Sequence, residues 1–374
     1  MRIVVDARTL FAEAPRGTGK AFLEVYRRLP AMCDDWEFTF LHRNRQVHSG
    51  SFDEFSNVSV QYTEIHGHRF NLWQSLRLPL TAKLKRADVL HCPANLGPRC
   101  SGTPVLVTIH DLIPMQANFR SKSWNAWGKR VGRIARQACF ITTPSEFSRL
   151  QIIETFGLPE HKVVSIPWAA NSSYRPLQPG EELDSVRARY QIEADQPYIL
   201  AFGAEDPRKN TKRILEAWTG LSAADRRDAV LIIVGLQERF RETLLASLRQ
   251  SSAVANVRLF GYIPEEDVPR LLGGAEFLCF PTLYEGFGLP VLDAFACDTA
   301  VLTSHNSSIP EVAGEAVMYV DPRCTKALAS GMATLLRDPT MRQQLVAVGR
   351  QQAQKFSWDR CAKQYSDVIQ RFAR

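Results

Sequence analysis

Short apolar runs separated by helix-period stretches extend along the whole chain. In the first half they occur at residues 2–6, 36–40, 88–92, 104–110 and 138–145, and in the second half at 198–204, 229–235, 257–262, 276–282, 300–304 and 316–320. Most are closed by Gly, Pro or a polar turn, as is typical of short strands buried on both faces. The alternation predicts an α/β protein with two doubly wound, Rossmann-like domains, each a parallel sheet flanked by helices.

A stretch rich in Pro, Gly and charge, NSSYRPLQPGEELD, separates the two series. It predicts a first domain at residues 1–175 and a second at 190–357, which suits a chain of 374 residues. Ser357 is a suitable N-cap for a last helix that starts at Trp358. We expect this C-terminal helix, at 358–374, to pack back on the first domain.

Open parallel sheets bind ligands beyond the carboxyl ends of their strands, so the loops there are the candidate site. The loop PTLYEGFGLPVLDAF, residues 281–295, passes from strand to helix through Gly286 and Gly288. Glycine lets a ligand approach the backbone, and the N-terminus of the next helix suits a phosphate. Taken alone, the loop is equally compatible with a purely structural turn.

Three further positions stand at predicted strand ends. Arg208 and Lys209, in FGAEDPRKNTKR, either begin a solvated helix or supply charge to a phosphate. The GTGK at 17–20 resembles a P-loop, but Ala14 and Ala21 occupy positions that need Gly and Ser or Thr, which excludes that motif. His110, in VTIHDLIP, is either a satisfied core residue or a group that faces the ligand.

A family resemblance adds to this interpretation. PTLYEGFGLPVLDA, followed by SSIPEVAGEAVMYVDP, resembles the C-terminal half of glycosyltransferase family 4, and HCPANLGP and PSEFSR extend the resemblance to the first half. The resemblance implies the GT-B fold, in which two Rossmann-like domains face a central cleft. It also implies a retaining transfer from a nucleotide-diphosphate sugar.

The resemblance also implies roles for particular residues. Glu285 would contact the transferred sugar and Asp293, where Glu is usual, the ribose hydroxyls. Lys209 would stabilise the diphosphate, and Arg208 would assist because Ala204 stands where an Arg is frequent. The remaining expected donor contacts are Gly17, Gly19, Gly203, Gly286, Phe287, Gly288 and Leu289. His110, oriented by Asp111, would lie near the sugar, so the expected catalytic residues are His110, Lys209 and Glu285.

The motifs lead to a specific chemical hypothesis. The chain contains no Asp-x-Asp, so we expect no metal and no other cofactor. We expect front-face transfer, in which the departing phosphate oxygen takes the acceptor hydroxyl's proton. EDPRKN and TLYEGFGLP resemble bacterial mannosyl and related deoxyhexosyl transferases of surface polysaccharide, which implies a GDP-sugar and a glycan or lipid-linked acceptor. A protein that binds the nucleotide sugar without transfer, or a nucleotide-sugar epimerase, stays open as an alternative.

The positive charge of the chain is concentrated in its first half, which bears on what the surface of that half binds. Residues 1–180 contain 23 Lys and Arg against 14 Asp and Glu, while the remainder has 23 against 25. The basic, aromatic-bearing stretches 68–86 and 112–145 suit either an anionic membrane surface or a solvated face, and no nucleic-acid module is recognisable.

No segment has the pattern of a signal peptide or a membrane span, so we expect a cytoplasmic protein, peripheral at the inner face of the membrane if the basic surface binds lipid. The eight cysteines have no metal-like spacing and are expected to be reduced core residues.

Overall fold

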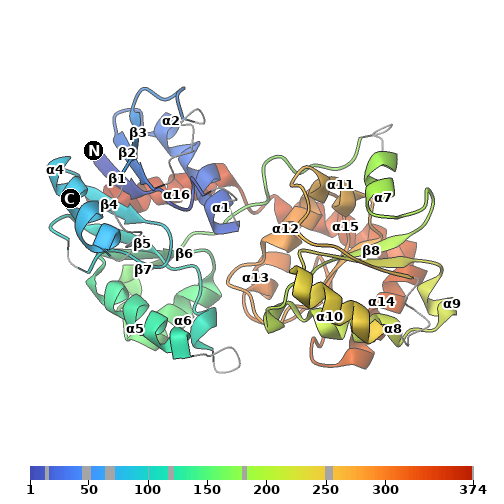
Figure 1. The fold of residues 1–374 in the computed structure, drawn as a ribbon. Helices are drawn as coiled ribbons and strands as arrows, with labels where there is room; N and C mark the ends of the chain where they lie inside the picture. The colour runs from blue at the N-terminus through green and yellow to red at the C-terminus, as the bar shows by residue number, and fades with distance from the viewer. Residues whose placement is uncertain are drawn as a thin grey trace. The chain divides into compact units, whose positions relative to one another are not determined.

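The computed structural model describes residues 1–12, 17–43, 52–63, 72–99, 101–116, 122–178, 183–248 and 256–372. The chain forms two compact units, Met1–Ala169 with Phe356–Arg374, and Ala170–Lys355 (Figure 1). The boundary expected at 175–190 therefore lies earlier, between Ala169 and Ala170. The reason is local, because Asn171 and Tyr174 both bond to Glu265 of the second unit, at 3.1 and 2.9 Å.

The described part of the first unit contains a seven-stranded parallel sheet in the order β3-β2-β1-β4-β5-β6-β7. Its strands are β1 (Arg2–Asp6), β2 (Glu37–His42), β3 (Val58–Tyr62), β4 (Val89–Cys92), β5 (Val105–Thr108), β6 (Phe140–Thr143) and β7 (Val163–Ser165). The five expected strands are confirmed. The two that the apolar pattern missed, β3 and β7, are the edge strands, whose residues are mostly only half buried.

Helices cover both faces of this sheet. They are α1 (Gly17–Tyr26), α2 (Leu29–Met32), the π turn η2 (Trp73–Arg77), α4 (Leu78–Leu84), η3 (Ile113–Met115), α5 (Lys122–Gln137), α6 (Glu146–Phe156), η5 (Glu160–Lys162) and α16 (Trp358–Gln370). Residues of α4, α5 and α6 share one buried cluster with Leu90 and Cys92 of β4. Because side chains alternate along a strand, His91 points to the other face, where it meets α1 and α16.

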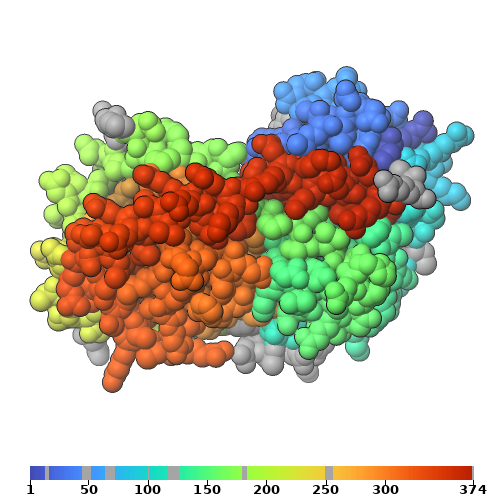
Figure 2. All heavy atoms as spheres, turned by 180° about the vertical axis from the view of Figure 1, so that it is seen from behind, coloured from blue at the N-terminus to red at the C-terminus, as the bar shows by residue number. Residues whose placement is uncertain are grey.

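The C-terminal helix α16 is part of the first unit. Ser357 caps it by accepting a hydrogen bond from the Arg360 amide, as expected. The helix packs against α1 and α2, and Arg28 donates to Asp359 at 2.8 Å. In Figure 2 the red C-terminal segment lies directly beside the blue N-terminal segment. Residues from the two ends of the sequence thus complete one core.

The described part of the second unit contains a six-stranded parallel sheet in the order β10-β9-β8-β11-β12-β13. Its strands are β8 (Tyr198–Phe202), β9 (Val230–Val234), β10 (Val257–Leu259), β11 (Phe277–Phe280), β12 (Val301–Ser304) and β13 (Met318–Val320). Its helices are α7 (Asp184–Arg189), η6 (Pro207–Lys209), α8 (Thr211–Thr219), α9 (Ala223–Arg226), α10 (Glu238–Leu248), α11 (Asp267–Gly273), α12 (Leu289–Ala296), α13 (Ile309–Ala313), α14 (Thr325–Arg337) and α15 (Pro339–Ala353). All six expected strands are confirmed.

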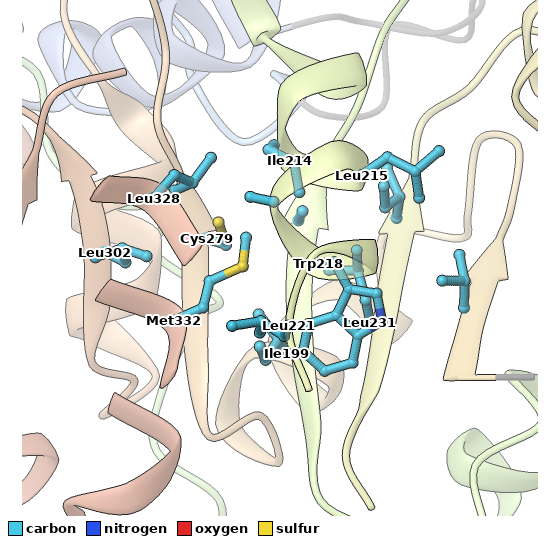
Figure 3. Close-up of a cluster of buried hydrophobic side chains, with 14 of the residues drawn as sticks. Ile199, Ile214, Leu215, Trp218, Leu221, Leu231, Cys279, Leu302, Leu328 and Met332 are labelled. Carbon is cyan, nitrogen blue, oxygen red and sulfur yellow. The ribbon is translucent and has the colours of Figure 1, made fainter. Parts of the chain in front are cut away.

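The core of the second unit fixes α8 against the sheet. Trp218 of α8 is fully buried among Ile199 and Leu231 of the sheet and Met332 of α14 (Figure 3). Its indole N–H donates to the Asn256 carbonyl at 3.1 Å, so the polar end of the ring is also satisfied. This packing fixes the position of α8 on the sheet, and therefore the start of the helix where the preceding loop ends.

The described cysteines are all free, and Cys33, Cys92, Cys279, Cys297 and Cys361 are buried as expected. Cys139 and Cys324 are exposed, so the expectation of a core position is wrong for these two. Cys324 caps α14 instead, accepting a hydrogen bond from the Ala327 amide. In the part of the chain that the structure describes, no helix has the length and apolarity to cross a bilayer.

The first unit should lose stability in mild acid. Burial, with repulsion from His110, lowers the pKa of His91 to about 3, and burial lowers that of His110 to about 4. Unfolded histidine titrates near 6.5, so the unfolded chain takes up protons that the folded chain does not. The free energy of unfolding should therefore fall by roughly 2 kcal/mol per histidine between pH 7 and pH 5, measured by urea unfolding.

His91→Gln separates this effect from general acid sensitivity. It removes one of the two groups and should reduce the acid-induced loss by about half, whereas His161→Gln at an exposed position should retain the full loss. Equal losses in the wild type and in His91→Gln would contradict the assignment.

Candidate active site

Strands β8 and β11 are neighbours at the point where the strand order of the second sheet changes direction. The loops that leave their carboxyl ends are bonded to each other. The Leu283 amide donates to the Arg208 carbonyl at 2.8 Å, and the Asn210 side chain donates to the carbonyls of Pro281 and Pro322 at 3.0 and 2.7 Å. Asn210 has a left-handed backbone (φ 57°), which an Asn tolerates better than most residues.

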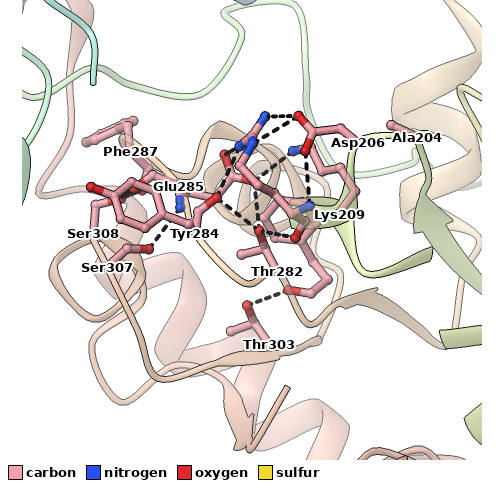
Figure 4. Close-up of polar contacts among 12 residues, drawn as sticks. Ala204, Asp206, Lys209, Thr282, Tyr284, Glu285, Phe287, Thr303, Ser307 and Ser308 are labelled. Atoms are coloured by element: carbon pink, nitrogen blue, oxygen red, sulfur yellow. Dashed lines mark hydrogen bonds and ion pairs between the residues drawn. The ribbon is translucent and has the colours of Figure 1, made fainter. Parts of the chain in front are cut away.

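Two cations and a carboxylate meet where these loops join (Figure 4). The Lys209 Nζ lies 2.8 Å from Glu285 Oε1, and Arg208 Nη1 lies 3.6 Å from Glu285 Oε2. Asp206 holds Arg208 by accepting from its backbone amide and its Nε, both at 3.0 Å. The Thr282 hydroxyl donates to Glu285 Oε1 at 2.9 Å. The structure therefore brings together three residues that the sequence predicts for one site.

The cluster is only partly open to solvent. The side chain of Lys209 is 21% exposed, that of Arg208 15% and that of Glu285 12%. The Lys209 ammonium also lies 4.6 Å from the centre of the Phe280 ring, a cation–π contact. A ligand at this cluster would thus meet charges that are oriented before it binds and only weakly screened by water.

Two serines that sequence reasoning did not assign support the Glu285 loop from the end of β12. The Glu285 amide donates to the Ser307 hydroxyl at 2.9 Å. The Ser308 hydroxyl lies 3.0 Å from the Glu285 carbonyl and 2.8 Å from that of Phe287. Their position just beyond a strand end was the signal that would have found them, since the same rule located Arg208 and Glu285.

The glycine at the end of β8 is required by packing. A Cβ on Gly203 would lie 2.5 Å from the Ile233 side chain and 2.7 Å from that of Leu236. The residue therefore allows the loop to leave the sheet close to β9. Its predicted contact with a donor stays a prediction.

The four residues after Glu285 carry the chain into α12. Gly286 and Phe287 are buried, and Leu289 is the first residue of the helix. Gly288 has φ +122°, a conformation that only glycine adopts readily, and a Cβ there would lie 2.9 Å from Ile309. The turn thus aims the amino end of α12 toward the side of the sheet where the charged cluster lies.

Asp293 contacts a different part of the second unit. Its Oδ1 accepts a hydrogen bond from the Asn171 amide at 3.0 Å. Burial, together with the charges of Asp293 and Glu265, raises the pKa of the nearby Tyr174. Asp293 thus faces residues 171–174, a partner that the sequence did not suggest, and its contact with a ribose stays a prediction.

His110 of the first unit is held in one tautomer beyond the end of β5. Its amide donates to Asn95 Oδ1 at 2.7 Å, and its Nε2 donates to the Pro93 carbonyl at 2.8 Å. Because burial lowers the pKa to about 4, the ring is neutral at pH 7 and Nδ1 is an acceptor. Within the described residues this buried Nδ1 has no hydrogen-bond partner. The partner of the His110 amide, Asn95, is a residue that sequence reasoning missed.

The two glycines of the GTGK segment belong to a helix. Gly17 and Gly19 are the first and third residues of α1, where a loop was expected. Helix α1 therefore begins at the first glycine of this segment. Ala14, used above to exclude a P-loop, lies outside the described residues.

Over the described ranges, no group of three or more His, Cys, Asp and Glu side chains is arranged to hold a metal ion. Arg208 and Lys209 are positive groups of the second unit that an anionic ligand could contact. Both lie beside the loop that leads into α12.

Comparison with known proteins identifies the family. The model described as Glycosyltransferase Family 4 matches residues 15–173, and the one described as Glycosyl transferases group 1 matches residues 184–352. The chain belongs to glycosyltransferase family 4. The predicted GT-B fold of two parallel-sheet α/β domains is also confirmed. The family 4 chain superposes on Anabaena Alr3699/HepE, crystallised with UDP and glucose, with a TM-score of 0.73 at 16% identity, covering 99% of each chain.

Two similar proteins of Escherichia coli are named as mannosyltransferases. The O-antigen chain mannosyltransferase B of Escherichia coli is 36% identical over 227 residues, which span 61% of this chain and 59% of that protein. The serotype-specific mannosyltransferase WbdA of Escherichia coli is 27% identical over 261 residues, spanning 67% of this chain but only 31% of WbdA. The matched region thus covers less than two thirds of either relative.

Removal of the Glu285 charge should tighten binding of a nucleoside diphosphate. Glu285 is the carboxylate that Arg208 and Lys209 share, so Glu285→Gln leaves more positive charge available to an anionic ligand. We expect the Kd for GDP, measured by titration calorimetry, to fall about three- to tenfold.

The control is a carboxylate at the opposite end of β11 from the Glu285 loop. Glu276 precedes β11 and pairs with Arg342. Glu276→Gln should leave the affinity for GDP unchanged. Weaker GDP binding in Glu285→Gln would show that the carboxylate does not compete with the diphosphate for these cations.

Proposed function

We propose that this family 4 protein transfers mannose, with retention of configuration and without a divalent metal, from GDP-mannose to a glycan or a lipid-linked saccharide in surface polysaccharide synthesis. The observation that carries the proposal is the convergence of Arg208 and Lys209 on Glu285 at the adjoining ends of β8 and β11. The names of the two Escherichia coli relatives support mannose as the sugar.

The proposed donor site uses different kinds of cation for different tasks. The guanidinium of Arg208 is planar and is oriented by Asp206, which suits two oxygens of a diphosphate at once. Lys209 is a compact charge that can approach the oxygen shared by phosphate and sugar. The amino end of α12 adds a partial positive charge for the same anion.

The proposed chemical step breaks the bond between the anomeric carbon and the phosphate oxygen. The acceptor hydroxyl forms the new bond on the same face of the sugar, and its proton passes to the departing phosphate oxygen. Lys209 stabilises the negative charge that grows on this oxygen before the proton arrives. The products are a mannoside of unchanged anomeric configuration and GDP.

His110 contributes an acceptor in this proposal. The neutral ring, fixed by the bond from Nε2 to the Pro93 carbonyl, presents Nδ1 to a sugar hydroxyl. A hydroxyl that donates to a buried nitrogen without another partner satisfies both groups. In this proposal His110 would thus orient a sugar hydroxyl.

The activity is tested by incubating the protein with a sugar acceptor and with GDP-mannose, GDP-fucose or UDP-glucose in separate reactions, with and without EDTA. We expect GDP release and glycoside formation with GDP-mannose, unchanged by EDTA, and an α-linked product by proton NMR because the donor is α-linked. An inverted product would contradict the retaining mechanism. Transfer from UDP-glucose alone would contradict GDP-mannose as the donor. Altered sugar from the donor without an acceptor would indicate an epimerase.

Lys209→Ala should reduce kcat far more than it raises KM for the donor. Loss of one group that stabilises transition-state charge typically lowers kcat about 10²- to 10³-fold. The exposed Lys212, the second residue of α8, is the matched control, and Lys212→Ala should retain wild-type kcat. Steady-state kinetics of both variants provide the measurement. An unchanged kcat in Lys209→Ala would show that this residue does not act in the chemical step.

A further inference from the structure

The helical segment formed by η2 and α4, with Leu72 as its N-cap, carries leucines on its outer side. Leu72, Leu76, Leu80 and Leu84 are spaced by four residues, which places neighbours on the same side of a helix. Their exposed fractions are 36%, 60%, 50% and 73%. Four exposed leucines in register form a continuous apolar strip, unlike the single exposed apolar residues that are common on protein surfaces.

The inner side of the same segment is firmly packed, so the leucines are not exposed by a loosely placed helix. Trp73 and Leu78 are fully buried. The Trp73 indole N–H donates to the Thr63 hydroxyl at 2.9 Å, and the Arg8 guanidinium lies 5.3 Å from the centre of its ring. Rotation of the segment to bury its leucines would break these contacts.

Exposed cations border the leucine strip. Arg77, Lys83, Lys85 and Arg86 are all exposed, and none forms an ion pair within the described residues. Helix α5, which shares a buried cluster with α4 on the same face of the sheet, adds the exposed Lys129, Arg133 and Arg136 at helical spacing. Figure 1 shows α4 and α5 as parts of the first unit, outside the sheet. This side of the unit is thus both apolar and positively charged.

We propose that η2 and α4 form a docking surface for an anionic lipid bilayer, with the leucine strip at the acyl boundary and the cations at the headgroups. A helix with an apolar strip flanked by Lys and Arg lies in the plane of the interface. Negative headgroups attract such cations within a Debye length of the surface. A solvated basic face would need the cations but not the leucines, which is why the observations favour lipid. The surface lies wholly in the first unit, so it does not depend on which sugar is transferred.

The test measures cosedimentation of the full chain with vesicles of phosphatidylcholine alone or mixed with phosphatidylglycerol. We expect binding to the mixed vesicles that weakens as salt rises. The triple variant Leu76→Ser, Leu80→Ser, Leu84→Ser should bind the mixed vesicles at least about tenfold more weakly. Lys83→Gln with Lys85→Gln should also weaken binding about tenfold or more.

Matched variants change the same residue types elsewhere. Leu150→Ser with Leu245→Ser alters exposed leucines, and Arg239→Gln with Lys326→Gln alters exposed cations. Both should bind vesicles like the wild type, and all variants should bind GDP equally, because the substitutions lie outside the donor cluster. If the wild type does not bind GDP, that result contradicts the proposed function but leaves the lipid-docking surface unaffected.

Three outcomes would overturn the proposal. One is a wild-type protein that ignores mixed vesicles, and another is equal binding by the wild type and the leucine variant. The third is self-association without vesicles, seen by analytical ultracentrifugation and abolished by the leucine substitutions, which would assign the strip to a second copy of the chain.

Discussion

The ion pair between Lys209 and Glu285 joins two loops whose residues are 76 positions apart in the sequence. It depends on the pairing of β8 with β11, which sets Ile199 opposite Phe277 and brings both strand ends to one edge. Trp218 fixes the helix behind the lysine, and the two serines after β12 fix the backbone of the glutamate. The relative positions of Lys209 and Glu285 therefore depend on packing across the second unit.

The positive and negative charges of this cluster balance. Arg208 and Lys209 are matched by Asp206 and Glu285, so no cation is left partly buried without a counter-charge. Under the proposed function, an arriving diphosphate takes over part of the role of the carboxylates. Glu285 then becomes available to a sugar hydroxyl.

The sequence predicted most of the fold because buried parallel strands are continuous apolar runs. The pattern failed at β3 and β7, where the edge of a sheet needs less apolar surface. Arg208, Lys209 and Glu285 could be predicted because each follows a strand. Ser307 and Ser308 also follow a strand, so the same rule could have found them, whereas Asn95 and Asn171 act through individual hydrogen bonds that leave no periodic signal. Gly17 and Gly19 were misplaced because glycine favours turns, whereas here both lie in the first turn of α1.

The return of α16 to the first unit has a consequence for synthesis on the ribosome. Tyr365 of α16 packs against His91, so the core of the first unit contains residues translated after all of Ala170–Lys355. The second unit is contiguous and can fold as soon as it leaves the exit tunnel. The unit translated first must therefore wait with part of its core uncovered until the unit translated second has emerged.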